Sequence, residues 1–263
     1  MPRFAANLSM LFTEAPLLER FERAARAGFG AVEIQFPYEH PAAAIRERLD
    51  EHRLALVLHN LPAGDWAAGD RGIACDPARR DEFRAGVARA IDYATTLGVT
   101  QLNALAGRPG AGVDDARTRR TLVDNLRYAA RALGDAGLRL LVEPVNRFDV
   151  PGFWLDTTAK AISVLDEVGA DNAFLQYDVY HAQRSEGELA ATIERLLPRI
   201  AHVQVADNPG RHEPGSGEID YRFVFAHLRR IGYRGAIGCE YKPAAGTEAG
   251  LGWLAWAHER LGS

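Results

Sequence analysis

The chain of 263 residues has the composition of an ordinary globular protein, with 47% hydrophobic and 25% charged residues. Its net charge of −4, without any basic run, argues against nucleic acid or an anionic membrane as a partner. Cys75 and Cys239 are the only cysteines, so no disulfide framework is expected, and no apolar run resembles a signal segment or a membrane span. We therefore expect a cytoplasmic protein, with residues 1–263 in one domain.

Short apolar runs without helical periodicity predict eight strands. They span residues 4–8, 31–35, 54–59, 101–105, 140–142, 174–178, 200–205 and 235–240. Segments with a helical pattern follow them at residues 16–27, 41–51, 77–97, 114–136, 156–168, 186–197, 221–231 and 247–261. Regular alternation predicts parallel βαβ units, and eight units in this length fit a closed (β/α)8 TIM barrel. An open dinucleotide-binding sheet should have a glycine-rich turn after its first strand, and residues 7–13 contain no glycine.

The fifth to eighth predicted strands each end in a polar side chain, and these are Glu143, Asp178, Gln204 and Glu240. In a TIM barrel, the carboxyl ends of the strands surround the active site. Three carboxylates can converge there only if a cation or shared protons offset their repulsion. An all-oxygen ligand set suits Mg²⁺, Mn²⁺ or Ca²⁺ better than Zn²⁺, so we predict one divalent metal site. The alternative interpretation is a set of unrelated ion pairs.

Four further residues are expected near the mouth of the barrel. His181 closely follows Asp178, His59 ends the third strand, Arg211 lies in the loop after the seventh strand, and Lys242 follows the eighth. We predict that these side chains bind the substrate. Arg211 is favoured as the clamp for a carboxylate because its planar guanidinium can bind two oxygens, and Lys242 is the second candidate. The alternative is that the histidines are structural and that the arginine is solvated.

Several longer motifs run nearly from end to end of the chain. They are Arg3-Phe-Ala-Ala-Asn-Leu-Ser-Met, His59-Asn-Leu-Pro-Ala-Gly-Asp-Trp, Glu143-Pro-Val-Asn-Arg-Phe-Asp, Gln176-Tyr-Asp-Val-Tyr-His, His202-Val-Gln-Val-Ala-Asp-Asn-Pro and Gly238-Cys-Glu-Tyr-Lys-Pro. In these motifs the chain resembles the hydroxypyruvate isomerase family, within the xylose-isomerase-like barrel superfamily of sugar isomerases and epimerases. The resemblance implies metal ligands at Glu143, Asp178, Gln204 and Glu240, with Glu143 and Glu240 as the catalytic acid–base pair.

The resemblance also implies an activity, the aldose–ketose isomerisation of hydroxypyruvate to 2-hydroxy-3-oxopropanoate (tartronate semialdehyde) through an enediolate. It implies one divalent metal ion, Mg²⁺ or Mn²⁺, no organic cofactor, and a small hydroxy or oxo acid as the substrate. The 2-oxo-tetronate isomerases are similar at the N-terminus and at Arg211-His-Glu-Pro. A longer 2-oxo sugar acid, or a related sugar epimerisation, is therefore the alternative.

Two other classes of protein are compatible with the same barrel. Abasic-site nucleases of the superfamily are expected to have a histidine-rich zinc rim and a basic face, and this sequence has neither pattern. A non-catalytic binding barrel would not need a glutamate on each side of its ligand. Whether the protein forms a homo-oligomer is left open.

Overall fold

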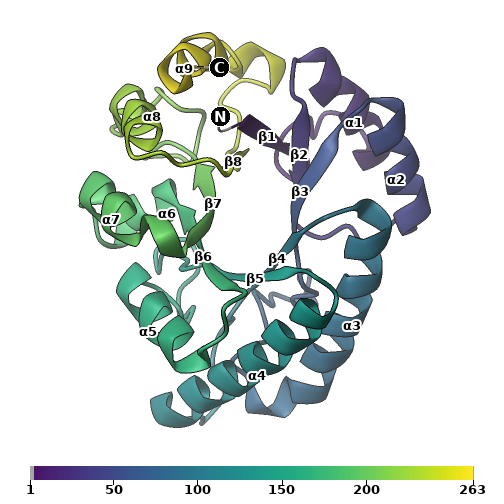
Figure 1. The fold of residues 1–263 in the computed structure, drawn as a ribbon, viewed down its shortest axis with the longest axis vertical. Coiled ribbons are helices and arrows are strands. Elements are labelled where there is room, and N and C mark those ends of the chain that lie inside the picture. The colour runs from purple at the N-terminus through teal and green to yellow at the C-terminus, as the bar shows by residue number, and fades with distance from the viewer. Residues whose placement is uncertain (1–2, 263) are drawn as a thin grey trace.

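The structure, a computed structural model, describes residues 3–262 and contains a closed barrel of parallel strands (Figure 1). The strands follow one another around the ring in chain order from β1 to β8. They are β1 (Arg3–Asn7), β2 (Ala31–Ile34), β3 (Ala55–Asn60), β4 (Gln101–Ala104), β5 (Arg139–Val142), β6 (Ala173–Asp178), β7 (Ile200–Val205) and β8 (Ala236–Cys239). The predicted TIM barrel is thus confirmed.

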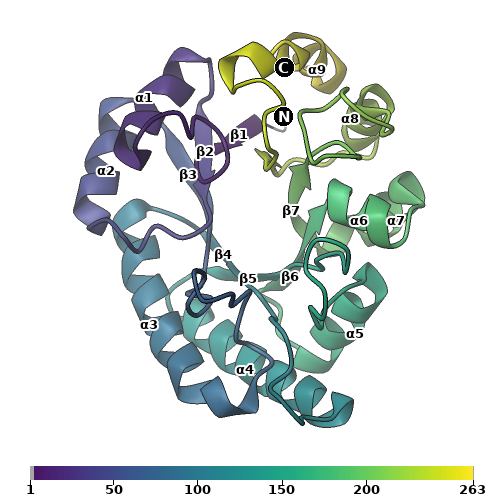
Figure 2. The same ribbon diagram turned by 180° about the vertical axis from the view of Figure 1, so that it is seen from behind.

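Helices surround the ring of strands when the molecule is viewed from either end (Figures 1 and 2). They are α1 (Leu17–Arg26), α2 (Ala42–Glu51), α3 (Arg80–Leu97), α4 (Asp115–Asp135), α5 (Thr158–Val168), α6 (Val179–Ser185), α7 (Leu189–Leu196), α8 (Tyr221–Arg230) and α9 (Trp253–Leu261). Three short 3-10 helices, η1 (Pro77–Arg79), η2 (Leu197–Arg199) and η3 (Glu248–Gly250), adjoin them.

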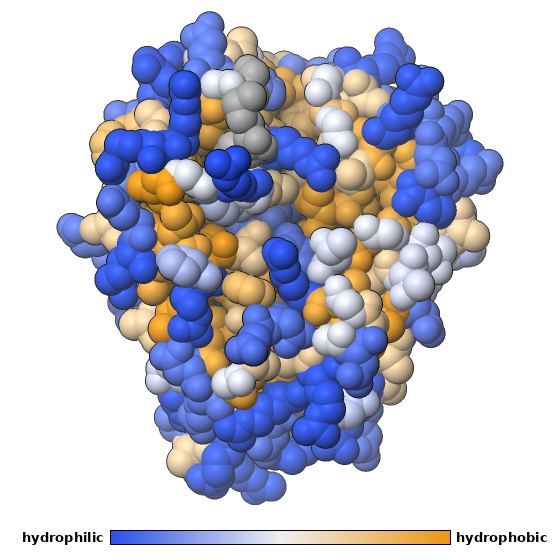
Figure 3. All heavy atoms as spheres, in the orientation of Figure 1, coloured by the Kyte–Doolittle hydropathy of each residue, from blue (hydrophilic) through white to orange (hydrophobic). Residues whose placement is uncertain are grey.

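The hydrophobic core fills the layer between strands and helices, to which α1, for example, contributes the buried Phe21 and Ala24. On the face seen in Figure 3, hydrophilic residues dominate the periphery, and hydrophobic ones gather nearer the barrel axis. No helix within residues 3–262 is long and apolar enough to cross a membrane.

The interior of the barrel contains hydrogen-bonded polar side chains, because alternate residues of each strand point inward. Asn7 on β1, Glu33 on β2 and Gln204 on β7 are almost fully buried there, and both amides donate to Glu33. Gly238 on β8 makes room for them, since a Cβ atom at this position would lie 2.3 Å from Glu33 Oε2. The barrel thus holds a buried polar layer beneath the ends of the strands.

Two predicted helices differ in the structure. The predicted helix at 186–197 corresponds to α7, which begins only at Leu189, and the sequence analysis missed α6, which begins directly after β6 where the Asp178 side chain caps its first turn. Gly187 and Glu188, with φ of 71° and 48°, then separate α6 from α7. The predicted last helix at 247–261 is also divided. Its first part is η3, and α9 begins only at Trp253, because glycines in this stretch weaken a continuous helix.

Candidate active site

The barrel brings Glu143, Asp178, Gln204 and Glu240 together at the carboxyl ends of β5 to β8, and all four side chains are buried. A cavity of about 580 Å³ opens at this end of the barrel, and both glutamates lie on its wall. Asp178 and Gln204 are outside the set of residues that line it. The cavity falls within the size range of sites that bind small molecules.

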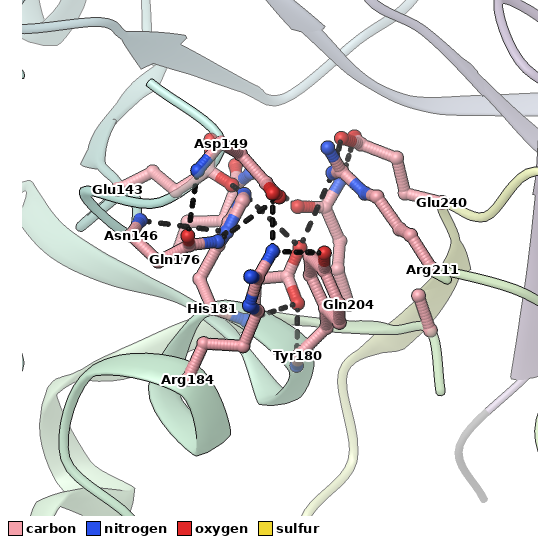
Figure 4. A network of polar contacts seen from close by, with 12 residues as sticks. Glu143, Asn146, Asp149, Gln176, Tyr180, His181, Arg184, Gln204, Arg211 and Glu240 are labelled. Atoms are coloured by element: carbon pink, nitrogen blue, oxygen red, sulfur yellow. Dashed lines mark hydrogen bonds and ion pairs between the residues drawn. The ribbon is translucent and has the colours of Figure 1, made fainter. Parts of the chain in front are cut away.

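The two glutamates enter the site from opposite sides (Figure 4). Glu143 follows β5 and Glu240 follows β8, three positions away around the ring. Glu143 Oε2 accepts a hydrogen bond from Asn103 Nδ2 at 3.0 Å. Glu240 Oε2 accepts from Asn7 Nδ2 at 3.0 Å and from Gln204 Nε2 at 2.6 Å. Amide groups from the barrel interior therefore fix both carboxylates.

Asp178 both ends β6 and caps α6, so its two carboxylate oxygens have different surroundings. Oδ1 accepts hydrogen bonds from the backbone N–H groups of Tyr180 at 2.8 Å and His181 at 3.3 Å. Oδ2 is buried without a hydrogen-bond partner, 3.7 Å from His181 Nε2 and 3.6 Å from Arg211 Nη2. An orphaned buried carboxylate oxygen is costly unless a cation binds it, so this atom suits a metal ligand.

Burial raises the pKa values of the three acidic groups. The pKa of Glu143 lies well above its usual range because of burial, and the charges of Glu240 and Asp178 add to the effect. Burial raises the pKa of Glu240 to about 7, although Arg211 opposes this change. Burial also raises the pKa of Asp178, against Arg211 and the two backbone N–H groups. A carboxylic acid with a pKa near 7, as at Glu240, can exchange protons near neutral pH.

His181 is held next to this cluster by Asn146. Its Nδ1 atom lies 2.6 Å from Asn146 Nδ2 and 3.5 Å from Asn146 N, both of which are donors. Nδ1 therefore accepts, and we assign the ring proton to Nε2. Burial, followed by the charges of Arg211 and Arg184, lowers the pKa of His181 well below its usual range. The neutral ring can donate its Nε2–H to a carboxylate or to a substrate oxygen.

Ligand atoms of Glu143, Asp178 and His181 lie within 4.8 Å of one another. Because the assigned tautomer places a proton on the Nε2 atom that faces the two carboxylates, His181 would have to lose this proton to bind an ion with them. This grouping differs from the predicted ligand set, in which Gln204 and Glu240 complete the site. Gln204 Oε1 accepts a hydrogen bond from Gln176 Nε2 at 2.6 Å, so its NH₂ group faces the carboxylates. The amide would have to turn over for Gln204 to bind a metal through oxygen.

The remaining candidates are placed differently. Arg211 lies on the cavity wall, and its Nη2 atom is 2.5 Å from Glu240 Oε1. Its backbone has a φ of 58°, and its carbonyl accepts a hydrogen bond from Lys242 N at 2.7 Å. Lys242 also lies on the wall, with an exposed side chain. His59 is fully buried and is outside the set of lining residues, so the structure does not bring it to the cavity with the others.

Glu33 is a central residue that the sequence analysis missed. Its Oε1 atom accepts hydrogen bonds from Asn7 Nδ2 at 2.9 Å and Gln204 Nε2 at 2.8 Å. Its Oε2 atom lies 2.8 Å from Nε2 of His202 on β7. The available signal was one acidic residue within the apolar run 31–35, since an inward-facing charge needs partners in the barrel.

Comparisons with known proteins agree with this architecture. Residues 21–256 match the family model described as xylose isomerase-like TIM barrel. The chain is 52% identical to hydroxypyruvate isomerase of Escherichia coli strain K12 over 254 residues, which cover 97% of this chain and 98% of that protein. It is 47% identical over 254 residues to 2-oxo-tetronate isomerase of Cupriavidus necator, with the same two coverages, 97% and 98%.

Solved structures are similar along the whole chain. A protein described as AP endonuclease, family 2, from Brucella melitensis has a TM-score of 0.94 and 45% identity, and the match covers 97% of this chain and 98% of that one. D-allulose 3-epimerase from Methylomonas sp. has a TM-score of 0.80 and 25% identity, with 99% of each chain covered.

Proposed function

The chain belongs to the xylose isomerase-like TIM barrel family, and from this premise we propose that it is a metal-dependent aldose–ketose isomerase. It is an isomerase of small sugar acids, like the relatives that match it along almost their whole length. The proposed reaction interconverts hydroxypyruvate and 2-hydroxy-3-oxopropanoate through an enediolate. The observation that carries this proposal is the pair of buried glutamates on opposite sides of one cavity.

Glu143, Asp178, Gln204 and Glu240 would hold one divalent ion, Mg²⁺ or Mn²⁺. The Oδ2 atom of Asp178 supports this assignment, because it is buried and accepts no hydrogen bond, and the Arg211 guanidinium that offsets its charge lies 3.6 Å away. When bound, the ion would polarise the carbonyl oxygen on C2 and the hydroxyl oxygen on C3 of the substrate and acidify the C3–H bond.

The isomerisation removes a proton from C3 of hydroxypyruvate and delivers one to C2. Glu143 and Glu240 approach from separate directions, so a substrate between them would present one carbon to each. One glutamate would accept the C3 proton and the other would donate to C2. Burial raises the pKa of both carboxyls, to about 7 for Glu240, and a general acid or base works best when its pKa is near the pH of the reaction.

His181, Arg211 and Lys242 are the proposed substrate-binding residues on the cavity wall. His181 can donate its Nε2–H to a substrate oxygen, while Arg211 offsets the charge of Glu240 and Asp178. His59 is also among the residues predicted to bind the substrate. Because its side chain is buried, it could affect substrate binding only by positioning its neighbours Asn60 and Tyr38.

An isomerase of 2-oxo-tetronate is the alternative, supported by the 47% identical relative and by a cavity large enough for a four-carbon acid. Purified protein should be incubated with Mg²⁺ or Mn²⁺ and either hydroxypyruvate or a panel of longer 2-oxo sugar acids, and followed by NMR. Hydroxypyruvate should give the highest kcat/KM. A higher value for a four-carbon acid would favour the alternative, and no conversion of any acid would contradict both.

The structural similarity to a protein described as an AP endonuclease calls for a separate assay. Among residues 3–262, the cavity wall carries one histidine, His181, and five acidic or amide side chains, which is unlike a histidine-rich zinc rim. Incubation with a duplex that contains an abasic site should give no strand cleavage.

A further inference from the structure

Four cationic side chains line the cavity, and they are Arg71, Arg184, Arg211 and Lys242. Two of them already have carboxylate partners. Arg184 pairs with Asp149 and Arg211 with Glu240 (Figure 4). Arg211 also pairs with Asp178. Within residues 3–262, Arg71 and Lys242 form no ion pair, so these two positive charges remain available to an anionic ligand.

The guanidinium of Arg71 is fixed in position by the protein. Its Nη1 atom donates hydrogen bonds to the carbonyl oxygens of Trp66 at 3.1 Å and Asp70 at 2.6 Å. Its Cζ atom lies 4.2 Å from the centroid of the Trp66 ring. The centroids of the Trp66 and Phe36 rings are 5.0 Å apart. Nε and Nη2 have no hydrogen-bond partner among the described residues. The group thus keeps free donors and needs little further ordering to bind a ligand.

The loop that carries Arg71 is anchored at both ends of its turn. Asp70 Oδ2 accepts hydrogen bonds from Asp65 N at 2.7 Å and Arg79 Nη1 at 2.6 Å. Gly72 then pairs with Ala106 beyond β4, with a φ of 112°. No larger residue fits there, because a Cβ atom would lie 2.5 Å from the carbonyl oxygen of Leu105. The loop therefore presents Arg71 to the cavity from a defined position.

We propose that Arg71 binds the carboxylate of the substrate and makes the enzyme selective for sugar acids over neutral sugars. This inference rests on the proposed function, and it differs from the expectation that Arg211 is the carboxylate clamp. Arg211 Nη2 is engaged by two buried carboxylates, with which a substrate carboxylate would have to compete. Lys242 lacks a fixed planar fork and extends an exposed, flexible stem, so binding would cost it more conformational entropy.

The test compares two ligands that differ in the carboxylate. Pyruvate has the 2-oxo acid group without a hydroxyl to isomerise, and hydroxyacetone has a methyl group in place of the carboxylate of hydroxypyruvate. Binding to the Mg²⁺-loaded protein should be measured by calorimetry for wild type, Arg71→Gln, Arg71→Lys and Lys242→Gln. Arg222→Gln is the matched control, because Arg222 also stacks on a tryptophan, with Cζ 4.5 Å from the Trp256 ring, but outside the cavity.

Arg71→Gln should weaken pyruvate binding by about 10- to 100-fold, the effect of losing a charge-assisted hydrogen bond, and change hydroxyacetone binding by less than about 2-fold. Arg71→Lys should recover part of the loss, and Arg222→Gln should behave as wild type. Equal losses for both ligands, no loss, or a selective loss in Lys242→Gln instead would overturn the proposal. A wild-type protein that binds pyruvate selectively but does not isomerise hydroxypyruvate would contradict the proposed reaction and leave the role of Arg71 intact.

Discussion

The buried ring of His59 should make the protein less stable in mild acid. Burial lowers the pKa of His59 to about 4, whereas a histidine in an unfolded chain has a pKa of about 6.5. Nδ1 lies 3.1 Å from the carbonyl oxygen of Asn60 and donates to it, and Nε2 is buried without a partner. Protonation would therefore place a second N–H and a positive charge where nothing accepts them.

The sign follows from proton binding in the two states. Between about pH 6.5 and pH 4, His59 is protonated in the unfolded chain but neutral in the folded protein. The unfolded state therefore binds more protons, and the free energy of unfolding falls as the pH falls through this range. The difference between the two pKa values corresponds to about 3 kcal/mol of unfolding free energy, and most of this should be lost between pH 7.5 and pH 4.5.

His59→Phe isolates this contribution, because it keeps a ring against Tyr38, whose centroid lies 5.9 Å away, and removes the titrating group. The Asn60 carbonyl keeps the hydrogen bond from Tyr38 Oη at 2.6 Å. Urea unfolding of both proteins should be followed at several pH values. As the pH drops to 4.5, the free energy of unfolding should fall by roughly 2 to 3 kcal/mol less in the variant than in wild type. A difference that stays constant over this range would refute the reasoning.

Two further substitutions test the metal site and the loop after β3. EDTA should abolish turnover by the wild-type protein, and full activity in metal-free protein would exclude the site. Asp178→Asn should weaken Mn²⁺ binding by more than about 10-fold in calorimetry, because it removes a charge beside the proposed ion while Oδ1 can still cap α6. Gly72→Ala should lower the free energy of unfolding by more than about 1 kcal/mol. Gly28→Ala is the control, because Gly28 also has a positive φ, of 91°, but nothing lies within 4 Å of a Cβ atom added there. If both variants lose the same free energy of unfolding, the contact with Leu105 has no role.

The strands and their polar ends could be predicted because both depend on local patterns. Residues 200–205 form β7 as expected, and the side chains that end β5 to β8 converge because a closed parallel barrel turns all carboxyl ends to one face. The start of α6 was missed because the apolar and aromatic residues after Asp178 have no clear helical period, and the cap that begins the helix is the same carboxylate interpreted as a ligand.

The inner partners of the site were harder to predict. Glu33 and Asn103 look like isolated polar residues in apolar runs. Which side chains they hydrogen-bond depends on how the strands are arranged in the barrel. The cations could not be ranked from sequence either. Arg211 and Arg71 both lie in loops, and only the folded loops determine that one is ion-paired and the other has free donors.

The most direct test of the central claim is hydrogen exchange in D₂O with hydroxypyruvate and the metal-loaded variants Glu143→Gln and Glu240→Gln, followed by NMR. Each variant should lower kcat by about 10²-fold or more, because it keeps the shape of the side chain and removes the group that carries the proton. The variant that lacks the acid for C2 should still exchange the C3 hydrogens without net isomerisation, and the variant that lacks the base should exchange neither. If both variants bind metal and isomerise hydroxypyruvate at the wild-type rate, proton transfer by this pair of glutamates is contradicted.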